Sequence, residues 1–195
     1  MDRREALRRI SLLMGGTLSV STVAGILGGC KAGPAGIPFT PQTFTPDQNE
    51  LVITLTELII PETDTPGAKA ARVNEFIDLM ITEWYSAEER DRFLAGVAEV
   101  DRRAQEAYGN AFIDATPEEQ TALLAAMEEE AIDWAEAVAA GTTGAQDPPF
   151  FNMIKELTLS GYYTSEIGAS VELRDMPFGT YDGAVPFEEI GRAWS

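Results

Sequence analysis

The side chains able to do chemistry in this chain are mostly carboxylates, because its 195 residues include no histidine and one cysteine. That composition excludes Ser–His and Cys–His nucleophiles, His-ligated metals, and zinc or iron–sulfur sites built from several cysteines. Glu62 and Asp64 lie close together in a turn-rich segment and could exchange protons with a substrate. Because Asp64 and Thr65 directly precede Pro66-Gly67, their spacing favours capping of the following helix instead.

A larger group of carboxylates lies between Thr116 and Ala140, where there are seven acids and no base. Glu129 and Asp133 are four residues apart and share a helix face, so their oxygens could bind a hard cation such as Ca²⁺. No EF-hand spacing accompanies them, and we therefore expect a solvated acidic face. Such a face could attract a basic partner surface.

The overall charge and the missing motifs narrow the function further. The formal net charge is -18, which argues against nucleic-acid binding, since phosphate affinity depends on clustered Lys and Arg. There is no GxGxxG sequence, no Gly-rich phosphate loop and no CxxCH haem-attachment sequence. We therefore expect no redox cofactor and no metal in this chain.

Residues 1–29 are predicted to be an export signal. Arg3-Arg4 precedes an uncharged stretch, Ile10 to Gly29, which is too rich in Gly, Ser and Thr for a good transmembrane helix. Paired arginines before a mildly apolar stretch resemble a twin-arginine signal. The chain is therefore expected to be exported.

The single cysteine, Cys30, follows Leu27-Gly28-Gly29, and this sequence resembles a bacterial lipobox. The resemblance predicts that Cys30 becomes the lipidated N-terminus of the mature chain and holds it at a membrane. The alternative is cleavage at nearby small residues, with an incidental cysteine. Residues 30–46, rich in Pro, Gly and Thr, are predicted to form an extended tether.

The remaining residues, 47–195, predict a single all-α domain of about five helices with an irregular C-terminal tail. Capping sequences at Thr45, Ser86 and Thr116 open three of the helices. The second helix is expected over about 68–85, and the fifth over 150 to about 160. Trp84 and Trp134 fall on apolar stripes and are predicted core residues. No segment has a convincing strand period.

The tail begins at Gly161 and carries two adjacent aromatic residues, Tyr162 and Tyr163. Aromatic side chains beside a glycine suit a protein interface, where they carry much of the binding energy. They equally suit packing of the tail onto the helices. Both roles remain open at this point.

Several of these segments together resemble the gluconate 2-dehydrogenase subunit 3 family. The segments are Arg3-Arg4, the stretch Leu58 to Ala68 with its Pro61-Glu62-Thr63-Asp64-Thr65-Pro66-Gly67 core, Thr116 to Gln120, Gly161 to Ser165, and Tyr181 with Gly183. The resemblance spans about residues 47–185. It implies a small subunit of a membrane-associated, flavin-dependent sugar or alcohol dehydrogenase.

The family resemblance further implies a non-catalytic role. The large partner, of the glucose-methanol-choline oxidoreductase type, binds FAD and oxidises the substrate, and electrons often leave through a cytochrome c subunit that carries haem c. The small subunit supplies the export signal, here Arg3 and Arg4, and helps the partner mature. A lipobox is not general in the family, so Cys30 would add a membrane tether.

A periplasmic, lipid-anchored location follows from this reading. The partner-facing surface is expected to involve Pro61, Asp64, Thr65, Pro66, Gly67, Gly161, Tyr162 and Tyr163.

The alternative function is a stand-alone exported lipoprotein that serves as a binding module.

Overall fold

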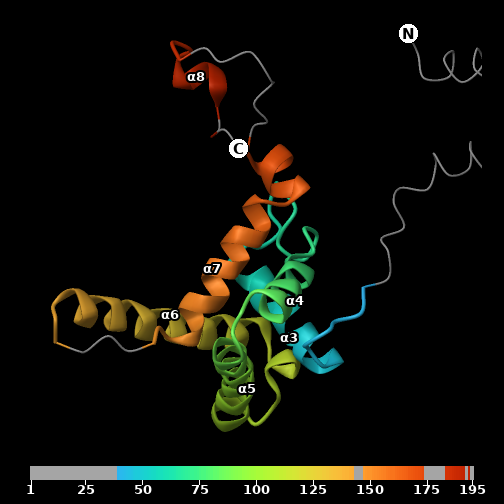
Figure 1. The fold of residues 1–195 in the computed structure, drawn as a ribbon, viewed down its shortest axis with the longest axis vertical. Helices are drawn as coiled ribbons and strands as arrows, with labels where there is room; N and C mark the ends of the chain where they lie inside the picture. The colour runs from blue at the N-terminus through green and yellow to red at the C-terminus, as the bar shows by residue number, and fades with distance from the viewer. Residues whose placement is uncertain (1–38, 143–146, 174–182, 192, 194–195) are drawn as a thin grey trace, which may run out of the picture. The chain divides into compact units, whose positions relative to one another are not determined.

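Every regular element described by the computed structural model is helical, and the predicted all-α class is confirmed (Figure 1). The structure describes residues 39–142, 147–173, 183–191 and 193, and no strand occurs in these ranges. Arg3, Arg4 and Cys30 lie outside them. None of the helices found there has the length and apolarity that a membrane crossing requires. The elements are α3 (Pro46–Ile59), α4 (Val73–Glu83), α5 (Ala87–Tyr108), η1 (Phe112–Asp114, a 3₁₀ turn), α6 (Pro117–Ala139), α7 (Phe150–Tyr163), η2 (Gly168–Glu172, a π-helical turn) and α8 (Phe187–Ile190).

The three predicted capping boxes are confirmed, and they fix where α3, α5 and α6 begin. At α3, the Thr45 hydroxyl accepts a hydrogen bond from the Gln48 N–H (3.3 Å), and the Gln48 side chain accepts one from the Thr45 N–H (3.0 Å). These bonds satisfy two donors that a helix start leaves unpaired. The same reciprocal pair joins Ser86 to Glu89 and Thr116 to Glu119.

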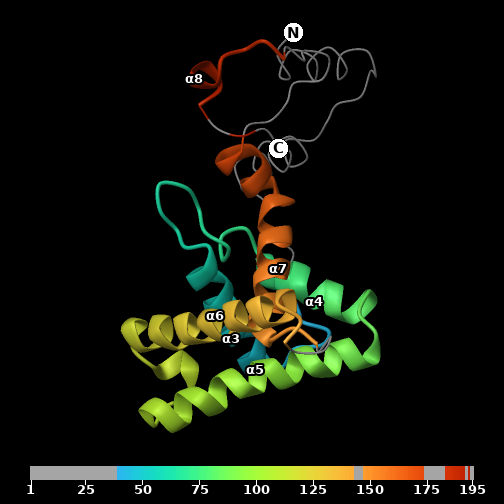
Figure 2. The ribbon, with the colours of Figure 1, turned by 90° about the vertical axis from the view of Figure 1, so that its left-hand side faces the viewer.

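Helix α7 is the centre of the fold, because it packs against α3, α4, α5 and α6. Figure 2 shows α6 crossing one end of α7, while the end nearest η2 extends beyond that crossing. The buried face of α7 carries apolar residues at helical spacing, which join those of the surrounding helices in one core. The fully or almost fully buried large side chains include Val52, Leu55, Val73, Ile77, Ile81, Phe93, Val97, Val100, Phe112, Ile154 and Tyr162.

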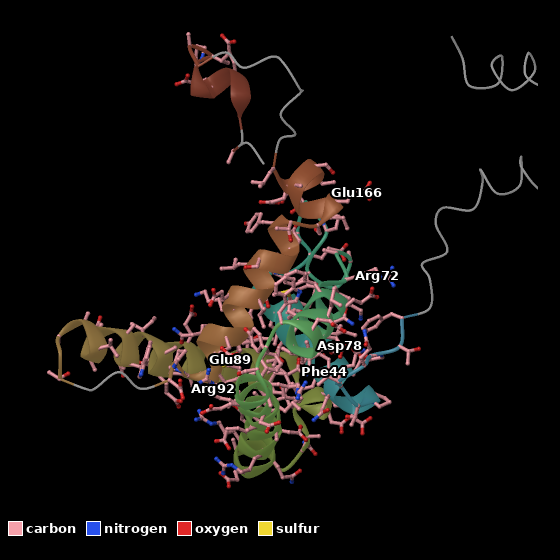
Figure 3. The ribbon with its side chains drawn as sticks, in the orientation of Figure 1. Phe44, Arg72, Asp78, Glu89, Arg92 and Glu166 are labelled. Carbon is pink, nitrogen blue, oxygen red and sulfur yellow. The ribbon has the colours of Figure 1, made fainter. Side chains whose placement is uncertain are left out.

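The segment that leads into α3 is fixed by Asp78, a fully buried carboxylate on α4. Its Oδ2 accepts a hydrogen bond from the Gln42 N–H (2.7 Å), and its Oδ1 accepts from the N–H groups of Thr43 (3.0 Å) and Phe44 (3.1 Å). Asp78 and Phe44 lie beside each other in Figure 3. A buried charge is tolerated only when it is well hydrogen-bonded, and three N–H donors meet that need. Within the range predicted as a tether, 30–46, residues 42–44 are therefore fixed to the helical domain.

The second predicted helix is shorter than expected. It was predicted over about 68–85, but α4 begins at Val73, because Arg72 adopts a left-handed conformation (φ 57°) that interrupts a helix. At the other end, α4 stops at Glu83, and Trp84 is 76% exposed. The prediction that Trp84 belongs to the core is therefore wrong, since Ile81 occupies the last buried position of this helix.

The last turns of α6 extend beyond the core, as Figure 1 shows. Ala131 is the last buried residue of this helix, and Trp134 is only half-buried. The core position predicted for Trp134 is therefore only partly correct.

The predicted irregular tail begins later than expected, because α7 continues through Gly161 to Tyr163. A Cβ atom at Gly161 would lie 2.7 Å from Phe76 Cδ1 of α4, so glycine is needed here for close helix packing. This glycine therefore does not end the helix, contrary to the prediction.

We expect Asp78→Asn to lower the free energy of unfolding by about 2–4 kcal/mol, because the amide would set a donor against the Gln42 N–H. Urea unfolding followed by circular dichroism measures the change. The control is Asp133→Asn on the exposed face of α6, which should change stability by about 0.5 kcal/mol or less. Equal stability of the two variants would contradict the anchoring role of Asp78.

Candidate functional site

The candidate site is the segment that joins α3 to α4 and carries Pro61 to Gly67, called here the 61–67 loop. Pro61 and Asp64 are exposed, Thr65 and Pro66 are half-buried, and Gly67 is buried. The loop closes on itself through two backbone hydrogen bonds, Ala68 N–H to Ile60 O and Thr63 N–H to Thr65 O, both 2.9 Å. It is therefore a turn of defined shape.

Glu57, in the last turn of α3, holds the two ends of the loop together. Its carboxylate accepts hydrogen bonds from the N–H groups of Glu62 (2.9 Å) and Lys69 (2.8 Å). Gly67 makes this approach possible, since an added Cβ atom would lie 2.5 Å from Glu57 Oε1 and 2.6 Å from the Glu62 nitrogen. Any larger residue at position 67 would therefore displace the carboxylate.

The predicted capping of the next helix by Asp64 and Thr65 is wrong. Asp64 instead accepts a hydrogen bond from the Thr63 hydroxyl (3.1 Å), and α4 begins without a side-chain cap. The physical reason is that the left-handed Arg72 separates the loop from the start of α4, so the N–H groups near Asp64 are not those of a helix end.

The 61–67 loop is also held from the far end of the chain. The Tyr162 hydroxyl of α7 donates a hydrogen bond to the Pro66 carbonyl (2.7 Å), and the Thr65 hydroxyl donates one to Glu172 Oε2 of η2 (2.7 Å). Burial, reinforced by the nearby charge of Glu172, raises the pKa of the Tyr162 phenol. The phenol therefore stays protonated, and remains a hydrogen-bond donor, throughout the neutral range.

The tail residues that were predicted to face a partner differ in their burial. Gly161 and Tyr162 are buried, so their contacts support the fold and the loop. Tyr163 is 40% exposed, and its ring packs edge-on against Tyr162 with centroids 5.3 Å apart. Tyr162 therefore packs onto the helices, as one of the two roles requires, and Tyr163 lies at the surface. The interface role of these tyrosines stays a prediction.

The carboxylates of α6 form the exposed acidic face that was expected. Glu129 and Asp133 are both exposed. Their neighbours are ion-paired across helices, Glu128 with Lys155 and Glu130 with Arg103, each with a 2.7 Å or shorter contact. Within the ranges that the structure describes, no group of three or more His, Cys, Asp or Glu could hold a metal ion.

Two residues of the candidate site, Glu57 and Glu172, were missed at the sequence level. Glu57 had a detectable signal, because an acid in the last turn of a helix opposes the helix dipole and needs another partner. Glu172 had none, since it lies 107 residues from Thr65 and no periodicity connects them. Glu57, Glu172 and Tyr162 together fix the shape of the 61–67 loop. A surface loop whose shape is fixed before binding suits recognition of another molecule.

These contacts define a helical domain built around one braced surface loop. The chain belongs to the gluconate 2-dehydrogenase subunit 3 family, whose model matches residues 46–182. The match begins with α3 and includes the 61–67 loop, α7 and η2. The family description names a subunit of a dehydrogenase complex. No curated protein and no solved structure matched the chain.

We expect Tyr162→Phe to lower the free energy of unfolding by about 0.5–1.5 kcal/mol, because the Pro66 carbonyl loses its donor while the ring remains packed. The matched control is Tyr163→Phe at the exposed neighbour, with an expected change within about 0.5 kcal/mol. Thermal or urea unfolding of both variants measures the difference. A Tyr162→Phe variant as stable as the wild type would show that this bond does not hold the loop.

Proposed function

We propose that this protein is the non-catalytic small subunit of a flavin-dependent dehydrogenase complex of the glucose-methanol-choline type. The observation that carries the proposal is the family match over residues 46–182, which covers the helical core and the braced loop together. The catalytic partner would bind the FAD and oxidise a sugar or alcohol, and haem c, where present, would belong to a further subunit. The 61–67 loop would help form the surface at which the small and large subunits meet, or hold that surface in shape.

The N-terminal residues give this subunit a second proposed role, in export and attachment. Arg3 and Arg4 would direct the folded complex through the twin-arginine route, so that a partner without its own signal is carried along. Cys30, once lipidated, would hold the complex at the membrane from the periplasmic side. The sequence patterns described above support both steps.

The electrostatics of the helical domain agree with a protein partner that carries basic groups. Much of the positive charge of the domain is used internally: hydrogen bonds from Arg102, and then from Arg103, lower the pKa of Glu99 to about 2. Arg103 also pairs with Glu130 of α6. The excess of acids over bases in the chain therefore remains as surface charge, which attracts a basic surface at long range.

The first test is affinity purification of the tagged full chain from its native cells in mild detergent. We expect a large subunit in about equal amount, with the absorbance spectrum of bound flavin. The control is the same purification from cells that carry the untagged chain. A colourless chain with no large partner, from cells shown to produce the dehydrogenase, would contradict the proposal and favour a stand-alone lipoprotein.

The attachment role has its own test. We expect Cys30→Ala to move the exported protein from the membrane fraction to the soluble periplasmic fraction, because the acyl chains that anchor it are lost. Cell fractionation and immunoblotting measure this, with signal cleavage as the control for correct export. Retention of the exported variant in the membrane fraction would exclude lipidation of Cys30 as the anchor.

A further inference from the structure

An apolar groove of about 210 Å³ lies where α3, α6 and α7 meet. Its lining is mainly aliphatic and aromatic, and the ion pair between Lys155 and Glu128 (2.6 Å) forms part of its wall. Lys155 also lies over the ring of Phe151, 5.3 Å from its centroid, which keeps this cation close to the surface of α7. The apolar residues that line the groove are Leu58, Ile59, Leu124, Ala125 and Phe151.

Exposed apolar side chains continue the helix faces of α6 and α7 that line this groove. On α6, Ile132 lies seven residues after Ala125 and therefore on the same face, and it is 53% exposed. On α7, Leu159 and Tyr163 follow Lys155 at intervals of four residues, and they are 39% and 40% exposed. Figure 2 shows α6 and α7 running in different directions from the place where they cross. We call the groove with Ile132, Leu159 and Tyr163 the α6–α7 face.

The α6–α7 face is pre-organised. Tyr163 packs edge-on against the buried Tyr162, whose hydroxyl is fixed to the Pro66 carbonyl of the 61–67 loop. The contacts of the loop thus help to position an exposed aromatic ring. A fixed aromatic side chain at the surface loses little entropy on binding and is typical of an interface anchor.

The exposed unpaired charges around the α6–α7 face are negative. On α6, Glu129 and Asp133 are exposed and directly follow Glu128 and Ile132 of this face, while its base, Lys155, is already paired with Glu128. A surface that is apolar at its centre and acidic at its rim complements one that is apolar at its centre and carries Arg or Lys at its rim. It would repel a second acidic copy of the same chain.

We infer that the α6–α7 face is the docking surface for the flavin-bearing large subunit, which would present an apolar ridge flanked by Arg or Lys side chains. This inference rests on the proposed accessory function and extends it, because it assigns the interface to α6 and α7. The 61–67 loop then supports the interface from behind through Tyr162.

The test compares two leucines that are both exposed on helices. Leu159 lies on the α6–α7 face, and Leu79, 47% exposed on α4, does not. We expect Leu159→Glu to reduce the flavin-bearing subunit recovered per tagged full chain at least about tenfold, because a carboxylate would be buried against the partner. Leu79→Glu should recover wild-type amounts.

Ile132→Glu, at the opposite end of the face, should reduce recovery of the flavin-bearing subunit as Leu159→Glu does. If thermal unfolding shows that Leu159→Glu has not folded, the result for Ile132→Glu tests the inference in its place. Equal recovery by the wild type and both α6–α7 variants would overturn the inference and leave the proposed function standing. If the wild-type chain recovers no flavin protein, both the inference and the proposed function are contradicted. Self-association of the purified wild type that Leu159→Glu abolishes would assign the face to a second copy and also overturn the inference.

Discussion

The buried carboxylate of Asp78 is the interaction on which the arrangement of the first half of the domain depends. By accepting three backbone hydrogen bonds from residues 42–44, it fixes the direction in which the chain enters α3 and places Phe44 in the core. Phe44 packs against Phe93 of α5, with centroids 6.1 Å apart, and Phe93 packs edge-on against Phe150 of α7 at 5.2 Å. One carboxyl group on α4 thus fixes a segment whose aromatic contacts join three other parts of the fold.

The second constraint is the bracing of the 61–67 loop, which depends on groups far apart in the chain. Glu57 acts from the preceding helix, while Tyr162 and Glu172 act from the opposite end of the domain. The family match includes all three, so the region that defines the family is also the region these contacts unite. The loop and the surface of α7 beside it therefore form one structural unit, and a change in either is transmitted to the other.

Local patterns predicted the helices and their capped beginnings well, because a capping box is a short-range device that needs only four residues, as at Ser86 to Glu89. The end of α7 and the exposure of Trp84 were not predictable in this way, since both depend on which neighbour a side chain meets. Gly161 looks like a helix stop until Phe76 is seen against it. The contacts of the candidate site were the least predictable: the position of Glu57 in the last turn of α3 indicates that it needs a partner, but not which backbone groups it binds.

The central position of α7 affects when the domain can form during synthesis. Helices α3, α4, α5 and α6 all pack against α7, which is made after them, so these four helices leave the ribosome before their shared partner exists. The bond between Tyr162 and Pro66 closes over 96 residues, and that between Thr65 and Glu172 over 107. Such long-range contacts cannot form until residues 162 to 172 have been made, so the core cannot close while only α3 to α6 have emerged.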